Sequence, residues 1–122
     1  MLPALLNQTA PELQPWGTPE DIGAETLEGP IAVAGLLVLG TPETAISAGY
    51  YSATRGRYRV VYPFHEHATV LEGRVTITAT ATGRSVTYGP GDSWVITRGE
   101  ELIWSIETDI VRKFYFATTG DL

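Results

Sequence analysis

The amino-acid sequence predicts an all-β domain of the sandwich or barrel kind. From residue 31 onward, nine short β-rich runs are separated by glycine, proline or charged turns, and short strands at this spacing are typical of such folds. The clearest stretch, residues 74–88, alternates between apolar residues and threonines, which is the period of a strand with one buried face. No ten-residue window has convincing helical periodicity.

The N-terminal quarter of the chain differs from the rest. Residues 1–30 contain five of the eight prolines and lack sustained periodicity. We therefore expect an irregular N-terminal arm over residues 1–30, packed across the barrel or onto a partner subunit. Residues 31–122 then form a single domain, since a chain of 122 residues suits one domain of ordinary size.

Within this domain the strands and turns are expected in a fixed order. They are an apolar strand over 31–39, a strand region over 56–77 with a Glu72-Gly73 turn, a hairpin over 74–88, a Pro90-Gly91 turn followed by a strand, and two terminal strands over 103–116. Gly83 makes the hairpin turn. One face of the hairpin's first strand carries Val75, Ile77, Ala79 and Ala81, and the other carries Thr76, Thr78, Thr80 and Thr82.

Composition and charge exclude several classes of protein. The chain has no cysteine, so neither a disulfide framework nor thiolate chemistry is available. Its net charge is −6 and residues 1–54 carry no lysine or arginine, which argues against a nucleic-acid partner because phosphate binding depends on those cations. Arg55, Arg57 and Arg59 form a stripe at period two, and we expect them to be solvated or paired with acids of the N-terminal arm.

The sequence also argues against a membrane location. Its longest apolar stretch, residues 31–39, is about half the length of a membrane-spanning helix. The first residues carry no basic region and hold prolines at positions 3, 11 and 15, unlike a secretory signal. We expect a cytoplasmic protein.

Three segments together resemble the cupin superfamily. They are VLEGRVTI (70–77), GPGD (89–92) and WSIETDIVRKFY (104–115). The resemblance covers roughly residues 49–117 and is strongest to the small single-domain branch, similar to the cupin domain of ureidoglycine aminohydrolase and to the ethanolamine-utilisation cupins. It implies a cupin-type jelly-roll β-barrel, often a homodimer, with a small-molecule pocket inside the barrel.

The resemblance also implies where a divalent metal would be held. Cupins of this kind use two histidines and a glutamate that precede a first glycine, here Gly73, and a histidine that follows a second glycine, here Gly99. Counted back from Gly73, the glutamate position falls on Glu66. The paired histidine positions fall near Arg59/Val61 or Val60/Tyr62, and the fourth position, counted from Gly99, falls on Leu102. Three of the four usual ligands are missing, so we do not carry the family's metal over.

The only two histidines offer another way to bind a metal. His65 and His67 are two residues apart, so on a strand both imidazoles point the same way and could face one Zn²⁺, Ni²⁺ or Mn²⁺ ion. The same alternation sends Glu66 to the opposite face, and the family register places Glu66 inside. A third strong ligand is not evident, whereas catalytic sites normally use three. The alternative is that both histidines lie at the surface or at a subunit interface.

Four residues are candidates for a ligand pocket. The resemblance suggests that Lys113 contributes to the pocket, where Glu66 would pair with it because an isolated buried charge is too costly; the alternative is a strand-edge lysine that discourages edge pairing. Trp104 matches the family's tryptophan and forms either an aromatic wall or part of the core. Tyr62 shares the face of Glu66 if the strand stays regular through Pro63.

These observations lead to three hypotheses of function. The first is a small-molecule-binding cupin without a tightly bound metal, whose pocket holds Tyr62, Glu66, Trp104 and Lys113. The second is a metal-dependent hydrolase, isomerase or dioxygenase that acts on a small polar metabolite. The third is a non-catalytic dimerisation or regulatory module with a filled interior.

Overall fold

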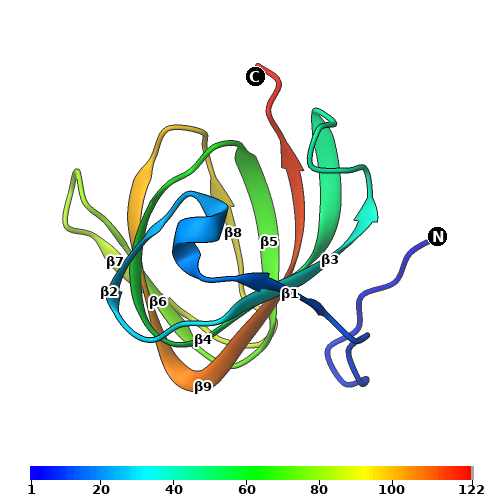
Figure 1. The fold of residues 1–122 in the computed structure, drawn as a ribbon, viewed down its shortest axis with the longest axis horizontal. Helices are drawn as coiled ribbons and strands as arrows, with labels where there is room; N and C mark the ends of the chain where they lie inside the picture. Colours follow the sequence, from blue (N-terminus) through cyan, green and yellow to red (C-terminus); the bar gives the residue numbers. More distant parts are fainter. Residues whose placement is uncertain (122) are drawn as a thin grey trace.

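The computed structural model describes residues 1–121 and is built almost entirely of antiparallel strands (Figure 1). The elements are β1 (Gln14–Gly17), the 3₁₀ helix η1 (Pro19–Ile22), β2 (Glu25–Glu28), β3 (Val33–Leu39), β4 (Ile46–Val61), β5 (His65–Glu72), β6 (Val75–Ala79), β7 (Ser85–Tyr88), β8 (Ser93–Ile96) and β9 (Glu101–Thr118). No helix in this part of the chain is long and apolar enough to cross a membrane.

Two long strands organise the fold. β4 and β9 pair with each other along almost their whole lengths, with one register shift between Thr54 and Gly56. The first half of β4 pairs with β3 and its second half with β2. The second half of β9 pairs with β5, which in turn pairs with β8, and its first half pairs with β6.

The two long strands therefore belong to two facing layers at once. One layer runs β1-β3-β4-β9-β5-β8, and the other runs β2-β4-β9-β6-β7. Within the described residues β7 and β8 do not pair with each other, so the curved sheet stays open at that edge. This is the expected jelly-roll architecture of an all-β cupin-type barrel.

Glycine permits the bend in β4. Gly56 has φ +151°, and a Cβ there would lie 2.5 Å from the carbonyl oxygen of Glu28. Only a residue without a side chain fits both the dihedral and this close approach. The register shift at Gly56 is also where β4 leaves one layer for the other.

The strand boundaries refine the expectations in three places. Residues expected to form separate runs are joined in β4 and in β9, and the expected pair of terminal strands is the single strand β9. The hairpin is present, with Thr76 and Thr78 bonded across it to Thr87 and Ser85, but Thr80 to Thr82 lie in the turn.

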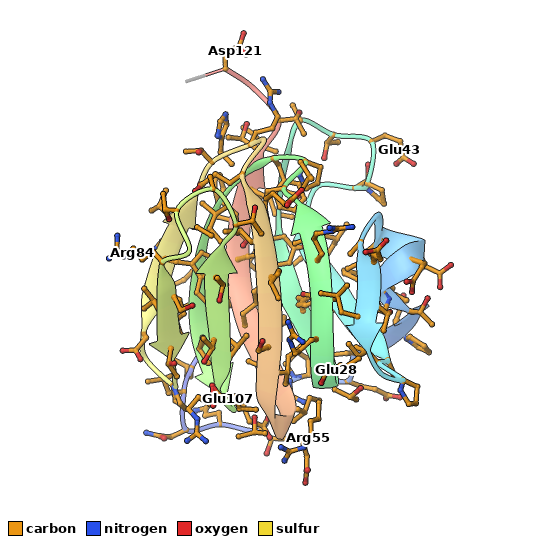
Figure 2. The ribbon with its side chains drawn as sticks, turned by 90° about the vertical axis from the view of Figure 1, so that its left-hand side faces the viewer. Glu28, Glu43, Arg55, Arg84, Glu107 and Asp121 are labelled. Carbon is orange, nitrogen blue, oxygen red and sulfur yellow. The ribbon has the colours of Figure 1, made fainter. Side chains whose placement is uncertain are left out.

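The N-terminal arm is more regular than expected. It contributes β1 to the edge of one layer and β2 to the edge of the other, with η1 between them. Its acids pair with two of the three arginines of the stripe: Arg57 Nη1 lies 2.9 Å from Glu28 and Arg59 Nη2 lies 2.7 Å from Glu25. Arg55 pairs with Asp109 of β9 instead. Figure 2 shows Glu28 and other charged side chains, such as Arg84 and Glu107, on the outside of the sheets.

Candidate functional site

The interior between the two layers holds one carboxylate and one ammonium. Glu66 on β5 is 2% exposed and Lys113 on β9 is 6% exposed, among neighbours that are nearly all apolar or aromatic. Alternation explains both positions: Ala68 and Val70 share the inward face of Glu66, and Val111 and Tyr115 share that of Lys113. The strands thus bring two opposite charges into the same interior.

These two groups form a closely connected polar cluster. Lys113 Nζ donates to Glu66 Oε1 at 2.6 Å, while the Tyr62 hydroxyl and the Trp94 indole N–H donate to Glu66 Oε2 at 2.8 and 2.9 Å. Lys113 Nζ also lies 3.4 Å from the Tyr62 oxygen. The carboxylate therefore has three donors, which satisfies a charge that would otherwise be expensive to bury.

Aromatic rings enclose the ammonium. The distances from Lys113 Nζ to ring centroids are 4.8 Å for Trp104, 5.0 Å for Tyr51, 5.3 Å for Tyr115, 5.6 Å for Trp94 and 5.8 Å for Tyr62. All lie within the range of cation–π attraction. The rings partly replace the hydration that Lys113 loses, but none of their faces offers a lone pair to its N–H groups.

Burial shifts the pKa values of this cluster. The pKa of Lys113 is lowered by loss of solvent, with Glu66 acting in the opposite direction. Burial and the nearby Glu66 carboxylate raise the pKa of Tyr62 well above its ordinary value, and the same two causes raise that of Tyr115 to about 12. The tyrosines therefore remain hydrogen-bond donors throughout the physiological pH range.

A cavity of about 170 Å³ gives access to the cluster. Glu66, Lys113 and Tyr62 line it together with Tyr51, Tyr58, Val60, Pro63, Phe64, Tyr115, Trp16 and Ile22. A second cavity of about 490 Å³ shares four of these residues, Trp16, Ile22, Phe64 and Tyr115, and extends toward the loop after β3. The polar cluster thus lies at the inner end of a two-part, largely apolar space.

The N-terminal arm forms part of this space. Trp16 of β1 and Ile22 of η1 line both cavities, and η1 lies over the opening of the curved sheet in Figure 1. The Trp16 ring packs directly on Gly35, where an added Cβ would lie 2.2 Å from it. The sequence predicted an arm packed across the barrel or onto a partner subunit, but nothing in the pattern of residues 1–30 singled out Trp16 or Ile22 as cavity residues.

The structure brings all four pocket candidates together, but only Tyr62, Glu66 and Lys113 line the cavity. Tyr58, Val60 and Tyr62 are all buried, which shows that Tyr62 stays on the inward face despite Pro63. Trp104 is 1% exposed and stacks on Tyr58 at 5.5 Å, and it is not among the described residues that line either cavity. Its core-packing role is therefore the one that its position favours.

The histidines lie outside this cluster. His67 is exposed, and His65 Nδ1 accepts a hydrogen bond from the backbone N–H of Arg98 at 3.0 Å. Residues 1–121 contain no group of three or more histidine, cysteine, aspartate or glutamate side chains able to hold a metal. At the family's glutamate position, Glu66 already has Lys113 as its cation. The residues present do not fit the divalent metal of metal-dependent cupins.

Trp94, Tyr51 and Tyr115 also contribute to the site. Trp94 is not among the four pocket candidates, yet its indole N–H donates a hydrogen bond to one oxygen of Glu66. Tyr115 has a sequence signal, since it shares the face of Lys113 at a spacing of two. Tyr51 has none, because its approach depends on how β4 pairs with β9: Tyr51 is opposite Lys113 in that ladder.

An open jelly roll whose interior side chains line a cavity is the architecture of a cupin. The chain belongs to the family of EutQ-like cupin domains, whose model matches residues 40–115. The search of curated proteins found no match.

Solved structures of low sequence identity share the fold. The EutQ protein of Clostridium difficile is 19% identical with a TM-score of 0.62, over 75% of this chain and 71% of that one. A putative ethanolamine utilisation protein of Salmonella typhimurium is 20% identical with a TM-score of 0.60, over 76% and 72%. A protein of unknown function from Pseudomonas syringae is 23% identical with a TM-score of 0.75, over 88% of this chain but 45% of that one.

Proposed function

We propose that this cupin domain binds a small molecule in the cavity above Glu66 and Lys113, and that it does so without a tightly bound metal. The observation that carries the proposal is the buried pair itself, 2.6 Å apart at the inner end of an accessible cavity. A buried ion pair gives weak evidence of stabilisation, because the desolvation of both charges offsets their attraction. Placed at the end of a cavity, the pair gives a ligand a charged point of attachment.

The cluster defines the kind of ligand. Lys113 offers an N–H donor at the inner end, beside the Tyr62 hydroxyl that is bonded to Glu66, and aromatic and aliphatic side chains form the walls. Such a site suits a compact molecule with an oxygen acceptor at one end and an apolar body. The larger cavity, which shares Trp16 and Tyr115, leaves room for a longer body.

A ligand screen with one substitution tests this proposal. Thermal-shift screening of small carbonyl and carboxylate compounds identifies a ligand, and calorimetry then compares the wild type with Glu66→Gln. The substitution removes the charge that holds Lys113 and Tyr62 in place, so we expect at least about a tenfold loss of affinity, typical of losing a charged hydrogen bond. The control is Glu72→Gln, which alters only a surface pair with Arg112. Equal affinity in the wild type and Glu66→Gln would contradict the proposal.

The same proposal covers the location, the oligomeric state and the partners of the protein. We propose a cytoplasmic homodimer that binds a metabolite and has no nucleic-acid partner. The net charge of −6 supports the last point, because such a chain repels phosphate backbones.

A further inference from the structure

Lys113 is the only lysine in the chain. The other seven basic side chains are all arginines, which stay protonated in proteins and are not nucleophiles. The single side-chain amine is therefore buried in the candidate pocket, beside Glu66. A lysine that served only for solubility or to protect a strand edge would lie on the surface instead.

The hydrogen bonds of this amine leave one position open. An ammonium has three N–H groups, and Lys113 Nζ has two acceptors, Glu66 Oε1 at 2.6 Å and the Tyr62 oxygen at 3.4 Å. The surrounding rings present π-faces only. Since Lys113 is among the residues that line the inner cavity, the third position is available to a group bound there.

We propose that this pocket binds small aldehydes or ketones and holds them covalently, as a protonated imine on Lys113 Nζ. The inference rests on the proposed ligand-binding function and names the chemical class of its ligand. Glu66 is the proton carrier, and Tyr62, whose O–H is donated to Glu66 and whose oxygen accepts from Lys113, relays protons between them. Both groups are within hydrogen-bond reach of Nζ or of each other, the arrangement required of a nucleophile and its base.

The step balances without any further reactant. Lys113 passes a proton to Glu66, and its free electron pair attacks the carbonyl carbon to give a carbinolamine. Glu66 returns this proton to the former carbonyl oxygen, then takes one proton from the nitrogen and passes it on as well, so that the oxygen leaves as water when the C=N bond forms. One ammonium and one carbonyl thus give one iminium ion and one water, and Glu66 ends as a carboxylate. The net charge of the buried site stays zero throughout, and the site ends as it began, with one positive and one negative group.

The burial of Lys113 also favours imine formation. Loss of solvent lowers the pKa of Lys113, which increases the fraction of free amine near neutral pH, as in other lysines that form imines. The walls select the ligand: a cavity of about 170 Å³ lined by Tyr51, Val60 and Phe64 accepts a short apolar chain or one aromatic ring. Alcohols and carboxylic acids of the same size can bind there but cannot form the imine.

Trapping by reduction tests the inference. The untagged wild-type protein is incubated at neutral pH with butanal or benzaldehyde and sodium cyanoborohydride, which reduces an imine to a stable secondary amine. Peptide mass spectrometry then compares Lys113 with the α-amino group of Met1, whose residue is fully exposed. An ordinary lysine, with a pKa of about 10.4 against about 8 for an α-amine, would be labelled more slowly than Met1. We expect Lys113 to be labelled at least about tenfold faster than Met1.

Glu66→Gln provides the mechanistic control. It is expected to slow labelling of Lys113 by about tenfold or more, since it removes the proton carrier, and to leave labelling of Met1 unchanged. Glu72→Gln, a surface substitution, is expected to label as the wild type does. Labelling of Met1 but not of Lys113 in the wild type would overturn the inference.

The two proposals fail in different ways. Thermal shifts are recorded with butanal and with butan-1-ol, its counterpart without a carbonyl. If butan-1-ol or butanal stabilises the protein and Lys113 is not labelled, the pocket binds small molecules but the covalent step is wrong. If a broad ligand screen yields no binder and Lys113 is not labelled, the proposed function itself is wrong.

Discussion

At the scale of single residues, the defining feature is a pair of charges that the core can accommodate only together. Glu66 and Lys113 are 2% and 6% exposed, and each is the other's only opposite charge within salt-bridge distance among residues 1–121. Removing one partner of a buried pair leaves an uncompensated charge, whereas neutralising both leaves none. The pair should therefore show strong energetic coupling.

A double-mutant cycle measures this coupling. Lys113→Met is expected to lower the free energy of unfolding by about 3–5 kcal/mol, because it leaves Glu66 buried and unpaired. The double variant Lys113→Met/Glu66→Gln should lose clearly less than the sum of the two single variants. Urea unfolding of the four proteins gives the comparison. Strictly additive losses would show that the two charges are not coupled.

The buried tyrosines predict how stability depends on pH. The pKa values of Tyr51, Tyr58, Tyr62 and Tyr115 are raised above 10.0, chiefly by burial. Above that pH the unfolded chain loses phenolic protons that the folded protein keeps, so stability must fall as pH rises. Each such group contributes a slope of up to about 1.4 kcal/mol per pH unit.

Lys113 acts in the opposite direction at lower pH. Its folded pKa is lowered from 10.5, so between the folded value and 10.5 the unfolded chain holds the extra proton and stability rises with pH. We therefore expect stability to peak near pH 10 for this cluster and to fall steeply above it. Urea unfolding across the alkaline range, with phenolate absorbance as a second signal, checks this. Tyrosine titration near pH 10 without loss of stability would contradict it.

At the scale of elements, β1 and η1 form one wall of the cavities through Trp16 and Ile22. The fit of Trp16 depends on Gly35 of β3, where a Cβ would lie 2.2 Å from the indole ring. Steric overlap of this kind commonly costs about 1–3 kcal/mol. The arm is thus held to the sheet by a specific close contact as well as by the β1–β3 ladder.

This contact predicts a second pair of coupled substitutions. Gly35→Ala should destabilise the protein by about 1–3 kcal/mol and displace Trp16, which a change in tryptophan fluorescence would report. In a Trp16→Ala background the same substitution should cost little, because the ring is gone. An equal cost in both backgrounds would show that Gly35 is required for another reason.

The strands also show which parts of the fold can be predicted from the sequence. The alternation in residues 74–88 and the glycine turns predicted a hairpin and an all-β fold because those signals are local. The joining of two runs into β4, and the strands in the N-terminal arm, depend on partners far away in the chain, such as Arg57 and Arg59 opposite β2. Periodicity within a segment carries no information on such pairing.

The candidate site was likewise predictable where local strand alternation decides a position, and not where long-range pairing does. Strand alternation placed Glu66 opposite to His65 and His67, and the resemblance to cupins fixed which side faced the interior. Lys113 remained undecided between pocket and edge, since β9 could be central or peripheral; it is central, between β4 and β5. Trp16 could not be assigned, because its place depends on the path of the arm.

At the scale of the whole molecule, one outer face of the sheet carries two exposed apolar side chains, Val95 of β8 and Phe116 of β9, with His67 of β5 between them. His67 pairs with Val95 on one side and with Phe116 on the other, and Phe116 pairs onward to Ala48. Val95 is 73% and Phe116 47% exposed. Exposed apolar side chains close together on one face are a common feature of subunit interfaces.

The predicted homodimer can be tested on this face. We expect light scattering after size exclusion to give twice the mass of 13.2 kDa, and Phe116→Glu to give the monomer with an unchanged circular dichroism spectrum. Arg84→Glu, in the turn between β6 and β7, is the control and should remain dimeric. A wild-type monomer at micromolar concentration would contradict the expectation.

The central claim is that the interior cation of this cupin is Lys113 and that its histidines face away from the ligand. The most direct measurement is a crystal structure of the untagged protein as isolated from cells, with anomalous scattering to identify any metal. We expect Lys113 Nζ on Glu66 at the inner end of the cavity, density for an organic ligand above it, and no anomalous peak there. A divalent ion inside the barrel, coordinated by inward-facing His65 and His67, would contradict the claim.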